Sequence, residues 1–129
     1  MPEAQASGDF AALGGHHYVN LTTFRRSGAA VVTPVWFALE GGKVYVVTTA
    51  EAGKIKRIRN NPQVQLAPST GGGKALGPAV EAVARLLPPG EWTAATRALN
   101  AKYGWRKRLF DVFFRLRQHQ RAYLEIRVA

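Results

Sequence analysis

The chain has 129 residues, a length that predicts one domain (1–129) able to bury an apolar core without disulfides or metals. It contains no cysteine, which excludes disulfides, thiol nucleophiles and thiolate zinc sites. The 18 Lys and Arg against 8 Asp and Glu give a net charge of +10, which attracts anions such as nucleic acid, an anionic membrane surface or a polyanionic small molecule.

The start of the chain has no recognisable targeting pattern. Residues 1–15 carry acidic and small side chains, without a basic start followed by an apolar core, so we expect no secretory signal. No apolar run approaches the roughly 20 residues that a membrane-spanning helix needs. We therefore expect a soluble, cytoplasmic protein.

The first half of the chain predicts a short helix and three strands. Residues 9–15 fit a short helix that ends at the glycine pair. Three segments rich in β-branched and aromatic residues follow, separated by glycine-containing turns, which indicates an antiparallel meander. These segments are residues 17–24 (HYVNLTTF), 29–39 (AAVVTPVWFAL) and 43–49 (KVYVVTT). Pro34 cannot donate to a ladder, so it predicts an edge, a bulge or an interruption, and we expect the strand to bend there.

The rest of the chain alternates between helical and strand patterns. Residues 51–61 (EAGKIKRIRNN) have isoleucines three apart and predict an amphipathic helix that ends before Pro62. Helical spacing returns from residue 91, with a break at Gly104 and a second stripe through residue 116. Three further strands are expected at residues 63–67, 79–87 and 121–128. The pattern therefore predicts a mainly β fold, a six-stranded barrel with short inserted helices.

The titratable residues do not form a catalytic set. His16 and His17 are adjacent, so on a strand they point to opposite faces, and His119 is alone in a basic segment; we expect no metal site. Ser27 and Ser69 lie in turns without a His–Asp signature, so a serine nucleophile is not expected. If the protein is an enzyme, a cofactor must supply the reactivity.

The strongest binding signal is the strand-to-helix junction at residues 47–57. Thr48 and Thr49 end the strand with hydroxyls that can donate to phosphate oxygens, and the helix start after them offers free N–H groups and partial positive charge. Lys54 and Arg57 are three residues apart, so both can reach an anion near the first turn. A solvated basic helix with its isoleucines facing the core explains the same pattern equally well.

A second group of basic residues lies among aromatic residues in the C-terminal half. Its members are Lys102, Arg106, Lys107, Arg108, Arg115, Arg117 and Arg121. Three interpretations stay open: an amphipathic helix that packs on the barrel or on a dimer partner, a rim that grips an anionic ligand tail, or a membrane-surface contact.

Three segments in this order resemble the split-barrel superfamily of pyridoxamine 5′-phosphate oxidase: residues 21–28 (LTTFRRSG), 32–37 (VTPVWF) and 54–62 (KIKRIRNNP). They are most similar to the small reductases that use the deazaflavin coenzyme F420, as is KYG at residues 102–104. The turn ends in Ser-Gly where the family usually has Asp-Gly. The resemblance implies an antiparallel split β-barrel (FMN-binding split barrel) and a homodimer with cofactor sites at the subunit interface.

The resemblance also implies which residues hold the cofactor. The phosphate contacts match Thr48, Thr49, Lys54 and Arg57, and the strand beside the ring matches Thr33, Pro34, Val35 and Trp36. In this family the cofactor carries the hydride, and a protein acid or base is not invariably needed. The implied function is an oxidoreductase in which reduced coenzyme F420 transfers a hydride to an unsaturated organic substrate.

Several alternatives stay open beside this function. FMN could replace coenzyme F420, although the positive charge favours F420, whose oligoglutamate tail adds carboxylates. The barrel could instead be a non-catalytic cofactor carrier. Binding of single-stranded nucleic acid is disfavoured, because the basic residues cluster on helices whereas such proteins stack bases on strand aromatics.

Overall fold

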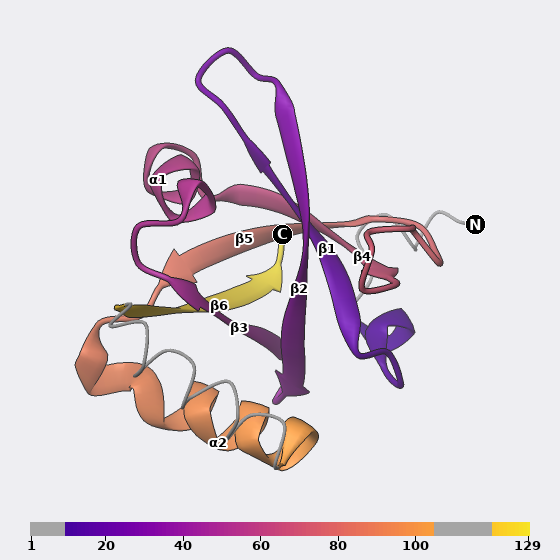
Figure 1. Cartoon of the computed structure of the whole chain (residues 1–129), viewed down its shortest axis with the longest axis vertical. Helices are drawn as coiled ribbons and strands as arrows, with labels where there is room; N and C mark the ends of the chain where they lie inside the picture. The colour runs from indigo at the N-terminus through magenta and orange to yellow at the C-terminus, as the bar shows by residue number, and fades with distance from the viewer. Residues whose placement is uncertain (1–9, 105–119) are drawn as a thin grey trace.

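The computed structural model describes residues 10–104 and 120–129, which form a closed, six-stranded antiparallel barrel with two α-helices (Figure 1). The mainly β barrel expected from the sequence is confirmed. The described elements are η2 (Ala11–Leu13), β1 (Tyr18–Phe24), β2 (Ala30–Glu40), β3 (Lys43–Thr49), α1 (Gly53–Asn60), β4 (Gln63–Ser69), β5 (Val80–Leu86), η3 (Pro89–Glu91), α2 (Trp92–Tyr103) and β6 (Arg121–Val128). The helical stripe expected between residues 105 and 116 lies outside the described residues.

The barrel starts as a meander and then closes by a return of the chain. β1, β2 and β3 are neighbours, as expected from the Gly-rich turns between them. After α1 the chain crosses to the other side of β1, where β4 pairs with it. β5 and β6 follow, and β6 pairs with β3, which gives the order β1-β2-β3-β6-β5-β4.

β2 changes its partner along its length. Residues 30–36 pair with β1, whereas residues 37–40 pair with β3. Each half of β2 therefore has one edge without a strand partner among the described residues. Pro34 lies in the first half, opposite Asn20, and the strand runs through it unbroken and in regular register. Of the three alternatives for Pro34, the structure shows an edge, and no interruption.

Two apolar clusters hold the fold together. One fills the barrel with inward-facing strand residues such as Leu21, Phe37 and Leu124, and the buried isoleucines of α1 close one end of it. The other lies outside the barrel, where α2 packs through Leu99 on Tyr45, Tyr123 and their neighbours. Helix α1 thus has a basic outer face and an apolar inner face that covers the end of the core.

The hydroxyl of Tyr103 ties the last turn of α2 to the strand junction. It accepts the N–H of Phe37 at 2.9 Å and lies 2.7 Å from the carbonyl oxygens of both Phe37 and His17, to one of which it donates. Burial raises the pKa of Tyr103 to about 12, so the group remains a neutral donor at physiological pH. Its ring also stacks on Trp36, with centroids 4.7 Å apart.

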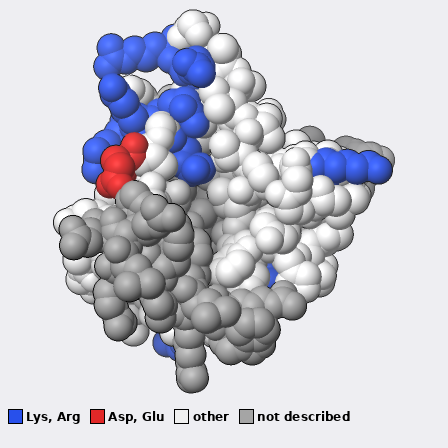
Figure 2. Space-filling model, viewed as in Figure 1, with Lys and Arg blue, Asp and Glu red and all other residues white. Residues whose placement is uncertain are grey.

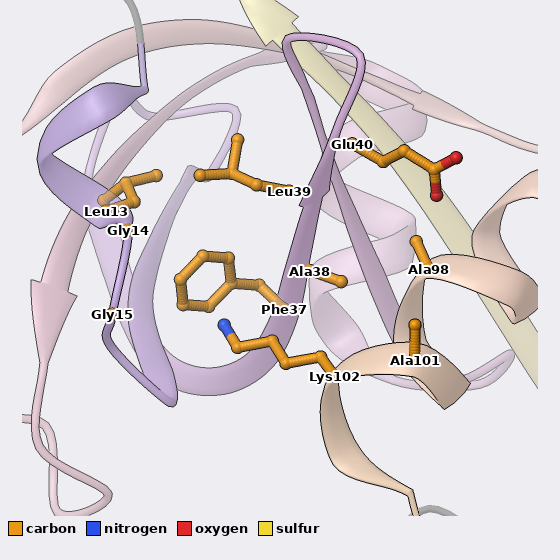
Figure 3. A pocket seen from close by; sticks show the side chains of 10 residues that line it. All are labelled: Leu13, Gly14, Gly15, Phe37, Ala38, Leu39, Glu40, Ala98, Ala101 and Lys102. Atoms are coloured by element: carbon orange, nitrogen blue, oxygen red, sulfur yellow. The ribbon is translucent and has the colours of Figure 1, made fainter.

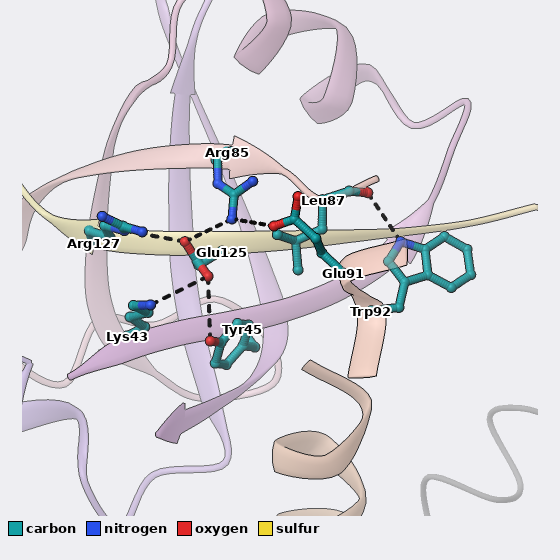
Figure 4. Close-up of polar contacts among 8 residues, drawn as sticks. All are labelled: Lys43, Tyr45, Arg85, Leu87, Glu91, Trp92, Glu125 and Arg127. Carbon is teal, nitrogen blue, oxygen red and sulfur yellow. Dashed lines mark hydrogen bonds and ion pairs between the residues drawn. The ribbon is translucent and has the colours of Figure 1, made fainter. Parts of the chain in front are cut away.

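A buried carboxylate joins three neighbouring strands on the outer face of the barrel (Figure 4). Glu125 is only 6% exposed, and its oxygens lie 3.2 Å from Arg127 Nε, 3.3 Å from Arg85 Nη2 and 3.8 Å from Lys43 Nζ. The Tyr45 hydroxyl donates to it at 3.4 Å. Burial acts to raise the pKa of Glu125, but the hydrogen bonds from the arginines and the charge of Lys43 outweigh it and lower the pKa.

We expect Tyr103→Phe to lower the free energy of unfolding by about 1–3 kcal/mol, because the Phe37 N–H is left buried without an acceptor. Urea denaturation measures the change. Tyr18→Phe is the control, since no described hydrogen bond involves the Tyr18 hydroxyl. Equal stability of the two variants would contradict the bridging role.

The lowered pKa of Glu125 predicts a pH-dependent contribution to stability. The stabilisation is complete above the unfolded value of 4.5 and is lost as the pH falls through the lower folded value. The difference in unfolding free energy between the wild type and Glu125→Gln should therefore shrink on acidification from pH 7 to pH values near 3. Denaturation at a series of pH values tests this; a difference that does not change with pH would count against it.

Candidate functional site

A basic cavity of about 430 Å³ lies between the β1–β2 turn and α1. Its lining residues are Arg25, Arg26, Gly53, Lys56, Arg57 and Asn60. Four of these six are cationic and none is acidic. Figure 2 shows the Lys and Arg side chains gathered over this end of the molecule. The cavity is therefore built to attract an anion.

The position of Arg57 in this cavity is fixed by two neighbours. Its Nε donates to the hydroxyl of Thr23 at 2.6 Å, and Thr23 is fully buried at the end of β1. Its guanidinium also folds back over Gly53, where a Cβ would lie 2.8 Å from Nη1. Gly53 thus leaves room for the guanidinium against the first turn of α1, the end with partial positive charge.

The first turn of α1 itself contains no acidic residue and no side-chain cap. Ala52 precedes the helix and provides no capping oxygen. Burial, and secondarily the charge of Arg57, lower the pKa of Lys54. Two cations thus lie close together at a helix N-terminus, the arrangement that binds phosphate and carboxylate groups.

The structure brings only part of the predicted phosphate site together. Of the four predicted residues, Arg57 lines the basic cavity, and Lys54 lies half-buried on the same helix. Thr48 and Thr49 end β3 half-buried, opposite Ala122 and Arg121 of β6. No hydrogen bond joins the four side chains to one another, so a shared phosphate site stays a prediction.

Sequence reasoning missed Arg25 and Arg26, which it assigned only to a turn. The paired arginines were visible, but nothing in the local pattern places this turn beside α1. The Thr23–Arg57 hydrogen bond, between residues 34 positions apart, joins the end of β1 to α1. The Arg26 guanidinium also donates to the side-chain oxygen of Asn60 at 3.5 Å.

The four residues predicted beside the cofactor ring do not share one face. Val35 is buried in the barrel core, whereas Pro34 is exposed on the opposite face. One face of Trp36 is covered by Tyr103. A ring along this strand would therefore meet backbone groups of residues 33–36 together with the side chains of only some of them.

Two buried polar atoms on these strands have no hydrogen-bond partner in the described structure. They are the hydroxyl oxygen of Thr33 and the amide oxygen of Asn20, on residues next to and opposite Pro34. An unpaired buried polar group costs about 1–3 kcal/mol. The two atoms lie on opposite faces of the sheet, because Thr33 pairs with the core residue Leu21 and Asn20 pairs with the exposed Pro34. Only the Asn20 amide oxygen therefore lies on the face where a ligand such as a flavin-type ring could supply a hydrogen bond.

Within residues 10–104 and 120–129, no three His, Asp or Glu side chains approach closely enough to hold a metal ion. None of the helices in this part of the chain is long and apolar enough to cross a membrane.

Residues 10–129 match the pyridoxamine 5′-phosphate oxidase family, and the chain belongs to this family. The match covers the whole barrel and confirms the resemblance seen in the sequence. A comparison with curated proteins gives no match.

Solved structures of the same fold have different ligands in their names. An F420 reductase is 20% identical with a TM-score of 0.62, over 100% of this chain and 96% of that chain. The haem storage protein HutZ from Vibrio cholerae is 15% identical with a TM-score of 0.69, over 89% of this chain and 83% of its own. A FAD-binding protein from Mesorhizobium loti is 15% identical with a TM-score of 0.65, over 90% and 82%. At such identities the likeness establishes the fold alone.

The length of the matched proteins also varies. The chain spans about half (48%) of the Atu2129 protein of unknown function from Agrobacterium tumefaciens, at 15% identity and a TM-score of 0.66.

We expect Gly53→Ala to weaken binding of inorganic pyrophosphate by about tenfold, because the new Cβ displaces the guanidinium of Arg57. Stability should change little, because the higher helix propensity of alanine offsets the loss of the Arg57–Thr23 hydrogen bond, each being worth about 1 kcal/mol. Calorimetric titration with pyrophosphate and thermal unfolding measure the two effects. Gly90→Ala is the matched control, because a Cβ there meets no atom. Unchanged pyrophosphate affinity in Gly53→Ala would remove Gly53 from the site.

Proposed function

We propose that this protein is an oxidoreductase that binds coenzyme F420 and reduces an unsaturated organic substrate. The observation that carries the proposal is the basic cavity in which Gly53 and Thr23 hold the Arg57 guanidinium against the helix N-terminus. Membership of the pyridoxamine 5′-phosphate oxidase family and the likeness to an F420 reductase support it.

The residues present fit this cofactor in three places. Lys54 and Arg57, with the hydroxyls of Thr48 and Thr49, would hold its phosphate. The carboxylates of its tail would pair with Arg25, Arg26 and Lys56, the other cations of the cavity. The ring would lie along residues 33–36 on the face of Pro34, where the unpaired amide oxygen of Asn20 can accept a hydrogen bond.

The cofactor would supply the hydride, and the protein would bind and orient the cofactor.

We also propose that the site is completed by a second copy of the chain in a homodimer. The edge of β2 at residues 30–36 is open in the described structure, and Val32 on it is 51% exposed. An open strand edge with an exposed apolar residue is suited to contact with a partner.

A flavin such as FMN is the second candidate cofactor, favoured by the likeness to a FAD-binding protein. The two cofactors make different demands on the basic cavity. FMN has a single phosphate and no oligoglutamate tail, so it would leave Arg25 and Arg26 without a ligand contact.

Titration of the purified protein with coenzyme F420, FMN and haem decides among the cofactors. We expect quenching of F420 fluorescence with saturation at micromolar concentrations and weaker binding of FMN. Tight FMN binding with no F420 response would favour the flavin alternative. A Soret band shift on haem addition, without a response to either of the others, would overturn the proposal.

We expect Arg57→Gln and Lys54→Gln each to weaken F420 binding by about 1–3 kcal/mol, the cost of a lost hydrogen bond to a charged group. Arg59→Gln is the matched control, because it removes the same charge from the exposed face of α1 and not from the cavity. Fluorescence titration measures all three variants. If Arg59→Gln weakens F420 binding as much as Arg57→Gln and Lys54→Gln, then the net charge of the protein, and not the position of these cations, controls F420 affinity.

The substitution Arg25→Gln distinguishes binding of the F420 tail carboxylates from binding of the phosphate. We expect it to weaken F420 binding and to leave FMN affinity unchanged, because only F420 carries tail carboxylates for Arg25. The same titrations provide the measurement, and equal losses for both cofactors would place Arg25 at the phosphate instead.

A further inference from the structure

A second cavity, of about 320 Å³, lies beside the end of β2 that is farther from the basic cavity (Figure 3). Its walls come from η2, from residues 37–40 of β2 and from the last turns of α2. Figure 3 shows Leu13, Leu39 and Phe37 on one side and Ala98 and Ala101 on the other. Most of this lining is apolar, unlike that of the basic cavity.

One cation enters this apolar space. Lys102 extends from the end of α2 beneath the Phe37 ring, with Nζ 3.4 Å from the ring centroid and 5.4 Å from that of Tyr103. Both are cation–π contacts. None of the described hydrogen bonds or ion pairs joins Lys102 to a carboxylate.

The acid nearest to this space does not neutralise Lys102. Glu40 lines the cavity, but its carboxylate accepts from Arg97 at 2.8 Å. Lys102 is half-buried, and burial lowers its pKa to about 8. Among the described residues this ammonium contacts only aromatic faces, and because it is partly removed from water, it gains most from an anionic partner.

We propose that this cavity is a second ligand site, which binds a small apolar monocarboxylate with its carboxylate on Lys102 and its hydrocarbon part against Leu39 and Ala101, the apolar lining residues with accessible surface. The size is at the lower end of the roughly 300–1,000 Å³ found for small-molecule sites. The single cation matches a single negative charge. The Glu40 carboxylate at the rim disfavours a phosphate dianion, which the four cations of the basic cavity suit better.

This inference is independent of the proposed cofactor. The carboxylate site uses none of the residues assigned to the phosphate or to the ring, and it lies beside the opposite half of β2. If F420 does not bind, the proposal of a carboxylate site still stands. If the carboxylate does not bind, the proposed cofactor function still stands.

The test compares 2-naphthoate with its neutral analogue 2-naphthamide by calorimetry on the full chain. We expect naphthoate to bind the wild type about tenfold to a hundredfold more tightly than naphthamide, the range that a hydrogen bond to a charged group provides. Lys102→Met should abolish this preference and leave naphthamide binding unchanged. Lys74→Met is the matched control, because Lys74 is exposed in the β4–β5 turn and its loss changes the net charge equally.

A second measurement follows Lys102 directly in the wild-type sequence. Reductive methylation with ¹³C-formaldehyde labels the lysines, and the Lys102 dimethylamino resonance is assigned by its absence in Lys102→Met. We expect naphthoate, but not naphthamide, to shift this resonance while the Lys74 resonance stays in place. Equal binding of the two probes, equal loss in Lys102→Met and Lys74→Met, or an unshifted Lys102 resonance would each overturn the proposal.

Discussion

The partner change of β2 between Trp36 and Phe37 is the constraint on which the rest of the structure depends. At that point the strand leaves β1 and joins β3, so each half of β2 keeps one open edge among the described residues. The Tyr103 hydroxyl holds the junction by bonding the Phe37 backbone and approaching the His17 carbonyl. One phenol thereby ties α2, the entry to β1 and the middle of β2 together.

Both candidate sites follow from this geometry. The first half of β2 carries the predicted ring contacts on its open edge and leads, through the turn to β1, to the basic cavity. The second half diverges from β1, and the space beside it is lined by η2 and the end of α2. A barrel in which β2 kept both partners along its whole length would fill these positions with paired strands.

The positive charge of the chain has different consequences at three places. Around Glu125 the cations Lys43, Arg85 and Arg127 converge on a buried carboxylate, and their charge contributes to stability (Figure 4). Around the basic cavity the cations converge on a space that no acidic residue lines. At Lys102 a single cation rests on an aromatic ring within apolar walls. The net charge alone distinguishes none of these arrangements, whereas the partners of each cation do.

The strands could be predicted from the sequence, but the cavities could not. Alternation, Gly-rich turns and the period of α1 depend on neighbours in the chain, and all six strands were predicted within two residues at each end. Lys102 was grouped with a basic cluster because its sequence neighbours are basic. Its burial under Phe37 joins residues 65 positions apart, and the hydrogen bond that joins β1 to α1 also links residues far apart in the sequence. No local pattern encodes such contacts.

Helix α1 shows why the two interpretations of its sequence were equally good. A basic helix that covers the core and a helix that grips an anion require the same pattern, and the structure shows that the first does not exclude the second. Ile55 and Ile58 bury one face, which fixes the helix on the barrel. Because the helix is fixed, Arg57 can reach the Thr23 hydroxyl of β1, and the missing side chain of Gly53 leaves space for its guanidinium. Burial of the apolar face is therefore the condition that gives the basic cavity its geometry.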